Sequence, residues 1–201
     1  MDSCGVIRRL GACERELIRD HLLRLSDADR HLRFGGHASP ERVADHCAAL
    51  DLSRVVVLGC MVDGVARGIG ELSPLPGGWQ RAAEVAISVE RPFQGRGIGG
   101  RLLRRLTRAA SNRWIQRLHM LCLLDNGRMV RLARQQGSRL SFEEGQIEAS
   151  LELPWPTGWT VLEELAGEAG AWWATRPAAA LPAYAARSRR ARACADGSSA
   201  A

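Results

Sequence analysis

Lysine is absent from the sequence, and all 28 basic residues are therefore arginine. A Walker A phosphate-binding loop requires a lysine beside its last glycine, so this absence excludes that class of nucleotide site. The net charge is nevertheless +6 at neutral pH. A positive surface of this kind favours anionic ligands, a phosphorylated cofactor included.

Cysteine pairs with metal-binding spacing are also missing. The six cysteines are scattered without a C-x-x-C pair. The nearest approach to a ligand cluster, His37 with His46 and Cys47, lacks a second pair of ligands. This spacing predicts free thiols in a reducing compartment and no bound metal.

Long hydrophobic runs are absent as well. No apolar stretch approaches the roughly 18 residues that a membrane span requires. The N-terminal stretch carries charged residues where a signal peptide would be apolar. We therefore expect a cytoplasmic protein that makes no membrane contact.

The N-terminal part of the chain is predicted to contain one strand and two helices. Ser39 and Pro40 suit the cap and the first position of the second helix. The polar segment 26–36 ends in two glycines and is expected to be a connection. The predicted elements are a strand at 5–10 and helices at 14–25 and 39–50.

After the second helix the hydrophobic period changes to two, which is typical of strands. Asp63-Gly64 is a strong hairpin signal because both residues tolerate positive φ. A hairpin meander followed by crossover units implies an α/β fold with a mixed sheet and helices on both faces. The predicted elements are strands at 53–62, 65–72, 82–89, 118–124 and 145–153, and helices at 98–113 and 126–136.

Composition divides the chain into three parts. Residues 1–155 carry the alternating pattern of a single domain. Residues 156–176 are rich in tryptophan and contain a capping-box match, Thr160 with Glu163, which predicts a C-terminal helix. This helix either packs on the domain or makes a contact with a second copy, as in a homodimer. Residues 177–201 are rich in alanine and arginine and are predicted to be disordered.

The segment "PFQGRGIGG" (92–100) places four glycines before a predicted helix. The first main-chain N–H groups of a helix lack partners, and glycine lets an anion approach them closely. A dinucleotide site is one alternative, since Gly95, Gly97 and Gly100 satisfy G-x-G-x-x-G and Asp125 follows a later strand. The gap after the preceding strand and the hairpin before it argue against that fold. A turn that only lets the helix pack on the sheet is the other alternative.

A third interpretation accounts for both the spacing and the context. Gln94-x-x-Gly97-x-Gly99 matches the Q/R-x-x-G-x-G/A signature, and the segment resembles the cofactor segment of the GNAT superfamily of N-acetyltransferases. The strand before it, the helix after it and Asn126 beyond the next strand agree with that resemblance. "LSDADRHLRFGG" and "AEVAISV" are similar to bacterial GNAT domains of the protein-lysine acetyltransferase type.

The resemblance implies the GNAT fold and an acetyl-CoA-dependent N-acetyltransferase that acts on a primary amine, either a protein lysine or a small amine. It implies Glu84 as the general base that takes a proton from the amine. Asn126 and the main chain of Ile87 and Val89 would lie along the pantetheine. The main-chain amides implied for the pyrophosphate are those of Gln94, Gly95, Arg96, Gly97, Ile98, Gly99 and Gly100.

One departure from the family pattern concerns the leaving thiolate. Many GNAT enzymes protonate it with a tyrosine after the asparagine-bearing strand, and the segment after Asn126 contains none. This leaves open a catalytically weak module that binds acetyl-CoA as a sensor or regulator. Nucleic acid is not an expected partner. The arginines of the helix after the glycine turn either contact the 3′-phosphate or form a solvated face: Arg101, Arg104, Arg105 and Arg108.

Overall fold

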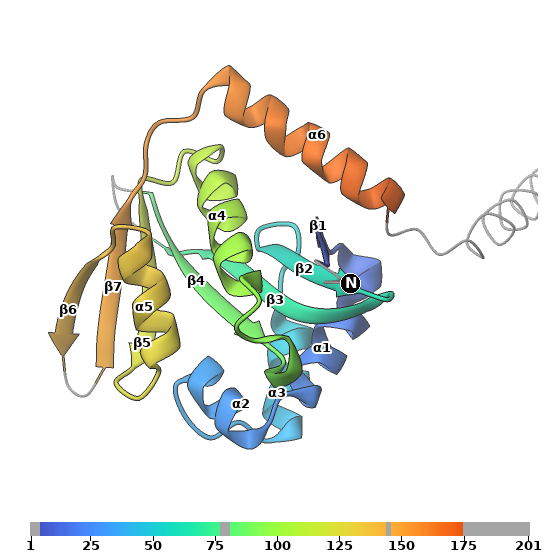
Figure 1. Ribbon diagram of the computed structural model, residues 1–201, viewed down its shortest axis with the longest axis vertical. Helices are drawn as coiled ribbons and strands as arrows, with labels where there is room; N and C mark the ends of the chain where they lie inside the picture. The colour runs from blue at the N-terminus through green and yellow to red at the C-terminus, as the bar shows by residue number, and fades with distance from the viewer. Residues whose placement is uncertain (1–4, 77–80, 144–145, 175–201) are drawn as a thin grey trace, which may run out of the picture.

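The structure is a computed structural model, and it describes residues 5–76, 81–143 and 146–174. Figure 1 shows its strands and helices in chain order. They are β1 (Val6–Arg9), η1 (Ala12–Glu14), α1 (Arg15–Arg24), α2 (Asp27–Phe34), α3 (Pro40–Ala49), β2 (Val56–Val62), β3 (Val65–Pro74), β4 (Ala82–Val89), η2 (Arg91–Phe93), α4 (Ile98–Ser111), β5 (Arg117–Leu123), α5 (Gly127–Gln135), β6 (Arg139–Glu143), β7 (Gln146–Glu152) and α6 (Gly158–Ala174).

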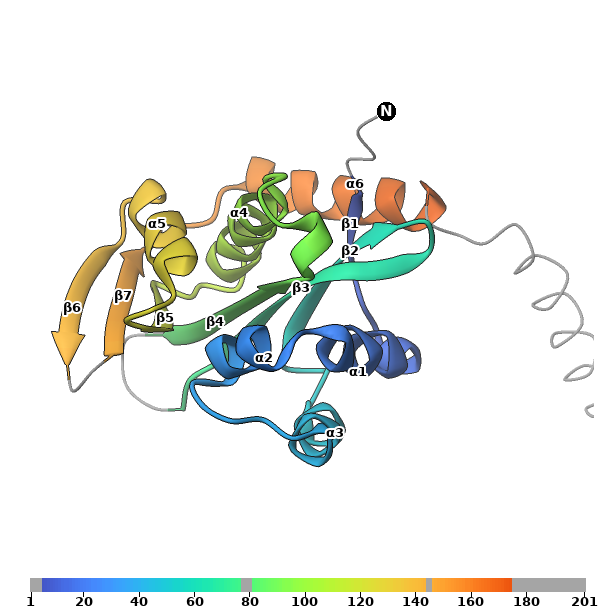
Figure 2. The ribbon, with the colours of Figure 1, turned by 60° about the horizontal axis from the view of Figure 1, so that its bottom comes forward.

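The strands form one mixed sheet in the order β1-β2-β3-β4-β5-β7-β6. Only the β4–β5 pair is parallel among the described strands. Helices α1, α2 and α3 lie on one face, and α4, α5 and α6 lie on the other (Figure 2). Each face has its own apolar core, one centred on Ile18 and Leu22 of α1 and the other on Leu102 and Leu106 of α4. The predicted α/β fold is confirmed.

Local signals placed several element boundaries correctly. The hairpin between β2 and β3 turns at Asp63 and Gly64, whose φ angles are 50° and 78°. Ser39 caps α3 by accepting a hydrogen bond from the Arg42 amide at 3.3 Å, and Pro40 begins that helix. Both devices act within a few residues, which is why the sequence alone predicts them.

The prediction that residues 26–36 form a connection is wrong, because Asp27–Phe34 is the helix α2. Ser26 caps it by accepting a hydrogen bond from the Asp29 amide at 3.2 Å. Two aspartates in the first turn stabilise the helix, because their negative charges lie near the positive end of its dipole. Gly35 ends the helix in the left-handed conformation, with φ of 66°. Caps at both ends support a helix whose apolar stripe is too short to be recognised from periodicity.

Two further corrections concern the C-terminal part. β6 is an edge strand that was not predicted, and it pairs with β7. The capping-box prediction is wrong because α6 begins at Gly158, so Thr160 lies inside the helix. Thr157 supplies the cap, and its hydroxyl accepts a hydrogen bond from the Thr160 amide at 3.2 Å. The tail predicted to be disordered, 177–201, lies outside the described residues.

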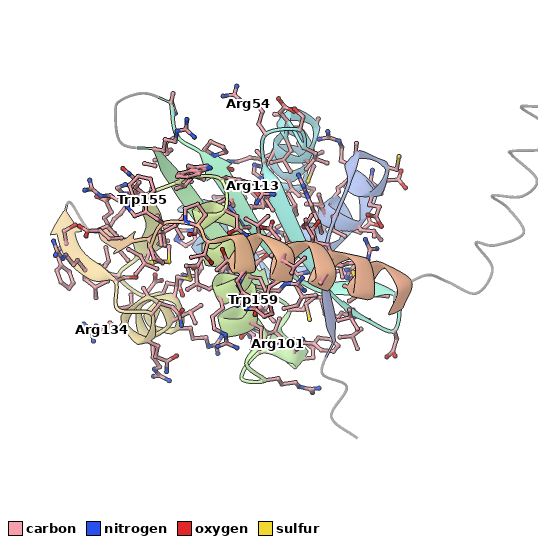
Figure 3. All side chains as sticks on the ribbon, turned by 90° about the horizontal axis from the view of Figure 1, so that it is seen from above. Arg54, Arg101, Arg113, Arg134, Trp155 and Trp159 are labelled. Carbon is pink, nitrogen blue, oxygen red and sulfur yellow. The ribbon has the colours of Figure 1, made fainter. Side chains whose placement is uncertain are left out.

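Helix α6 lies across the domain (Figure 3). Charged groups of α4 and of the turn after it form ion pairs with α6. Arg113 pairs with Glu164 at 2.8 Å, and Arg108 pairs with Glu163 at 3.0 Å. Arg105 donates a hydrogen bond to the main-chain oxygen of Ile7 in β1. Arg101 also donates to the main-chain oxygen of Gly5 at 2.7 Å, so three of the four α4 arginines contact the protein itself. None of the helices within the described residues is long and apolar enough to span a bilayer.

Candidate active site

The parallel strands β4 and β5 pair over only part of their length. The register joins Ala82 to Arg117 and Glu84 to His119, and it ends there. β4 nevertheless continues to Val89 and β5 to Leu123. The two strands therefore diverge beyond Glu84 and His119, and the sheet opens between them.

A cavity of about 600 Å³ lies at this opening, between α2, β4, the start of α4 and α5. Its size is typical of small-molecule sites. Arg96 does not line it, and its guanidinium lies 5.3 Å from the centroid of the Phe93 ring. The other predicted cofactor residues do line it: Ile87, Val89, Gln94, Gly95, Gly97, Ile98, Gly99, Gly100 and Asn126.

The turn before α4 presents main-chain N–H groups to this cavity. Gly95 and Gly97 have φ angles of 73° and 75°, in the left-handed region that glycine adopts without strain. The Arg101 amide bonds to the Gly97 oxygen at 3.1 Å and is the first of α4 to find a partner within the helix. Within the described residues, the three preceding amides, from Ile98 to Gly100, have no partner and are free to bind a ligand. Their positive helix end suits a phosphate.

The side chain of Gln94 fixes the position of the glycine turn. Its side-chain nitrogen donates to the Val89 oxygen at 2.8 Å, so it ties the turn to the end of β4. Its side-chain oxygen accepts a hydrogen bond from Arg128 of α5. The side chain of Gln94, the first residue of the signature, therefore links the end of β4 to α5 by hydrogen bonds. Sequence spacing identifies this residue but does not predict its partners.

A sequence profile of the Acetyltransferase (GNAT) family matches residues 22–137, which include the splayed strands, the glycine turn and α5. The chain belongs to the GNAT acetyltransferase family. The resemblance stated from the sequence is confirmed. GNAT proteins are acyl-CoA N-acyltransferases that use acetyl-CoA as co-substrate. No curated protein matches the sequence.

Solved structures of GNAT proteins share the fold. The GNAT domain of PAT from S. lividans has 23% identity and a TM-score of 0.63, with 73% of this chain and 89% of that chain covered. A putative acetyltransferase from Acinetobacter baylyi has 17% identity and a TM-score of 0.61, with 78% and 97% covered. Ribosomal-protein-alanine N-acetyltransferase from Brucella melitensis has 18% identity and a TM-score of 0.56, with 73% and 98% covered. At these identities the likeness concerns the fold alone.

A second cavity of about 250 Å³ lies on the same opening and includes Glu84. It shares Leu32, Arg33, Ile87, Asn126 and Met129 with the larger cavity, so the two cavities adjoin. Glu84 is half-buried. Within the described part of the chain its carboxylate has no hydrogen bond and no ion pair, so it is not held in a structural salt bridge there.

Asn126 has a structural task at the junction of the two cavities. Its side-chain oxygen accepts a hydrogen bond from the Met129 amide at 3.2 Å and caps α5. Cys122 on β5 also borders the second cavity, and its burial raises the pKa of the thiol to about 11. A thiol with that pKa is protonated at neutral pH, which makes this cysteine a poor nucleophile.

Several residues that line the larger cavity were not predicted. Asp29, Leu32 and Arg33 come from α2, which the sequence analysis treated as a connection. Arg128 and Arg131 come from α5 and add positive charge opposite the glycine turn. The signal that could have revealed the first group is Ser26 followed by two aspartates, a typical helix start. Nothing in the local sequence indicates that α5 faces the turn.

A buried polar network lies behind the cofactor strand. His21 of α1 has no exposed surface, and its Nε2 lies 2.9 Å from the hydroxyl oxygen of Ser88. Glu90 lies beside it, where Arg24 and Arg67 donate to its two carboxylate oxygens at 2.8 and 2.9 Å. Burial acts to raise the pKa of Glu90, but hydrogen bonds from His21, Arg24 and Arg67 hold it at about 2. The network fixes the end of β4 against α1.

Glu71 of β3 forms a second buried group on the α1–α3 face. Its two carboxylate oxygens lie 2.7 Å from Arg33 Nη2 and 3.0 Å from His46 Nε2. Burial acts to raise the pKa of Glu71, but the charge of Arg33 and the hydrogen bond from His46 outweigh it and lower the pKa to about 2. Arg33 lines both cavities, so this ion pair also positions part of the site.

The low pKa of Glu71 predicts acid sensitivity. A folded pKa of about 2, against 4.5 for an ordinary glutamate, contributes stability that is complete above pH 4.5 and is lost as the pH falls toward 2. Between pH 7 and pH 3 that contribution falls by about 2 kcal/mol. We expect Glu71→Gln to be less stable at pH 7 but to lose about 2 kcal/mol less over this interval, measured by urea unfolding. Glu152→Gln, at an exposed glutamate of β7, should keep the wild-type slope, and parallel curves for all three proteins would contradict the prediction.

Proposed function

We propose that the chain transfers the acetyl group of acetyl-CoA directly to a primary amine, with a protein lysine as a stronger candidate than a small amine. The observation that supports this most is the pair of adjoining cavities at the opening between β4 and β5. One cavity carries the open amides of the glycine turn, and the other carries the unpaired carboxylate of Glu84. This arrangement suits a ternary complex in which cofactor and amine meet at the opening of the sheet.

The reaction requires a deprotonated amine, a polarised thioester carbonyl and a departing thiolate. Glu84 is positioned to take a proton from the amine as a general base. Main-chain N–H groups in the unpaired stretch of β4 are suited to polarise the carbonyl oxygen, because they are fixed in place before the reaction begins. The amides from Ile98 to Gly100 and the nearby arginines would hold the phosphates. The cofactor supplies the activated acetyl group.

The test is thiol release from acetyl-CoA with a panel of lysine peptides, N-terminal peptides and small amines. We expect release that depends on the acceptor and saturates with it. Because the chain contains no lysine, any acetyl-lysine in the mixture belongs to the added acceptor and not to the enzyme. The Brucella melitensis relative is a ribosomal-protein-alanine N-acetyltransferase, which makes protein N-terminal amines a necessary part of the panel.

A second candidate function rests on one observation. The α5 region, where many GNAT enzymes carry a tyrosine acid, has none. A module that binds acetyl-CoA as a sensor would need the glycine turn but no acid. Saturable binding of acetyl-CoA in calorimetry, combined with no thiol release across the whole panel, would favour the sensor and reject the transferase.

A further inference from the structure

A histidine lies directly across from the candidate base at the point where the sheet opens. His119 of β5 and Glu84 of β4 are register partners and form the last pair before the strands diverge. Neighbouring strands lie about 4.8 Å apart, and partners in register share a face of the sheet. His119 is therefore beside Glu84, which lines the second cavity, and on the same face of the sheet, although His119 itself lines neither cavity. Its position in the sequence alone gives no indication of a role at the site.

The hydrogen bond that His119 makes defines which of its nitrogens is basic. Nδ1 is bonded to a carboxylate oxygen of Glu148 in β7. An ionised carboxylate can only accept, so Nδ1 carries the proton in the neutral ring and Nε2 keeps its lone pair. Within the described residues, Nε2 has no hydrogen-bond partner. About a quarter of the His119 side chain is exposed, at 23%, so a substrate or a water molecule can reach it.

His119 lies on a part of the sheet that none of the described helices covers and that carries both acidic and basic side chains. Helices α1, α2 and α3 cover the β1–β4 part of this face and leave the β5–β7 part uncovered (Figure 2). On the β5–β7 part of this face and at its border with β4, the register places five charged groups around His119: Glu84 on β4, Arg117 on β5, Glu148 and Glu152 on β7, and Arg139 on β6. Arg139 is 3.9 Å from Glu152, Glu148 is bonded to the ring, and Glu84 is the register partner of His119.

The number of protons that leave the amine indicates what His119 could do in the reaction. A primary amine in water at neutral pH is an ammonium ion, with one carbon substituent and three N–H bonds. The amide product keeps only one N–H bond. Two protons must therefore leave the nitrogen during acetyl transfer. A single carboxylate can hold only one of them at a time, so a second acceptor beside Glu84 would complete the balance.

We propose that His119 is a second catalytic base of this chain and that Glu148 is its positioning residue, an inference that rests on the proposed acetyl transfer. One ammonium proton passes to Nε2, directly or through one water, while the Nδ1 proton stays on the ring and remains hydrogen-bonded to Glu148. The amine lone pair then forms the C–N bond at the thioester carbonyl, the C–S bond breaks, and sulfur leaves as a thiolate with the electron pair. The second proton passes to Glu84, and solvent afterwards takes the protons from both bases.

The test uses His119→Ala, with the exposed His31→Ala of α2 as the matched control. We expect His119→Ala to lower kcat/KM for the best amine about 100-fold while the Kd for acetyl-CoA stays unchanged. Added imidazole should restore at least about tenfold of that loss, because it can supply the missing base. His31→Ala should behave as wild type with and without imidazole. His119→Gln, which keeps the side-chain volume, should show the same loss if the alanine variant folds poorly.

Glu148→Gln tests the positioning role. It should lower kcat by about tenfold on its own and have no further effect in the His119→Ala background, because it acts through the ring. Wild-type rates for both His119 variants would overturn the proposal and leave the acetyl transfer standing. Loss of activity without imidazole rescue, or accompanied by loss of acetyl-CoA binding, would indicate a structural role and would also overturn it. If the wild type transfers no acetyl group to any amine, the proposed function fails and this inference fails with it.

Discussion

Replacing Glu84 by glutamine is expected to lower kcat for the amine acceptor about 100- to 1,000-fold, the range typical of a lost general base. Glutamine keeps the shape of the side chain but cannot accept a proton from an ammonium ion. Glu84 lines the smaller cavity and not the larger one, so the Kd for acetyl-CoA should stay within about twofold of wild type. The measurement is steady-state thiol release together with calorimetry.

The pH dependence separates this role from a loss of shape. The activity of Glu84→Gln should rise with pH, because a larger fraction of the acceptor is then already a free amine and needs no base. The matched control is Glu152→Gln, at an exposed glutamate of the same sheet, and this variant should keep wild-type kinetics. Near-wild-type turnover of Glu84→Gln at neutral pH would show that this carboxylate is not the base.

A valine at position 97 is expected to weaken binding of coenzyme A at least about 100-fold. Gly97 lines the larger cavity at the mouth of α4, and a side chain added there would meet no protein atom within 4 Å. The valine would therefore project into the space that leads to the open amides. Two lost hydrogen bonds to a charged phosphate, at about 1.5 kcal/mol or more each, account for the expected loss.

The backbone strain of Gly97→Val needs its own control. Gly97 has φ of 75°, which costs about 1–2 kcal/mol for a residue with a side chain. Gly64 in the β2–β3 turn has φ of 78° and also has no atom within 4 Å of an added Cβ, but it does not line the cavity. Gly64→Val should therefore lose similar stability and keep wild-type affinity in calorimetry. Equal affinity of both variants for coenzyme A would remove the glycine turn from the binding site.

The residues that sequence reasoning predicted well belong to devices a few residues long. The turn at Asp63-Gly64 and the start of α3 at Ser39 depend on the backbone preferences of the residues themselves. The glycine turn belongs to the same group, because open amides at a helix start are a property of any helix that begins with glycines. For the same reason the family signature could be recognised before any fold was known.

Two elements with weaker local preferences, α2 and β6, were not predicted from the sequence. Helix α2 has capped ends but few apolar positions, so its helical state depends on packing beside β4 and the cavity. Strand β6 is short and lies at the edge of the sheet, where pairing with β7 provides its only ladder. In both cases a partner distant in sequence supplies the stabilisation, and hydrophobic period alone does not report it.

By itself, the sequence determined the α/β class, the glycine turn and the candidate roles of Glu84 and the signature residues. Only the tertiary structure brought Arg33 to Glu71, His21 to Ser88 and His119 to Glu148. The physical reason is that turn and cap energies depend on adjacent residues, whereas the pairing of distant charged and polar groups depends on strand register and burial. Those become defined only when the sheet and both helical layers have assembled.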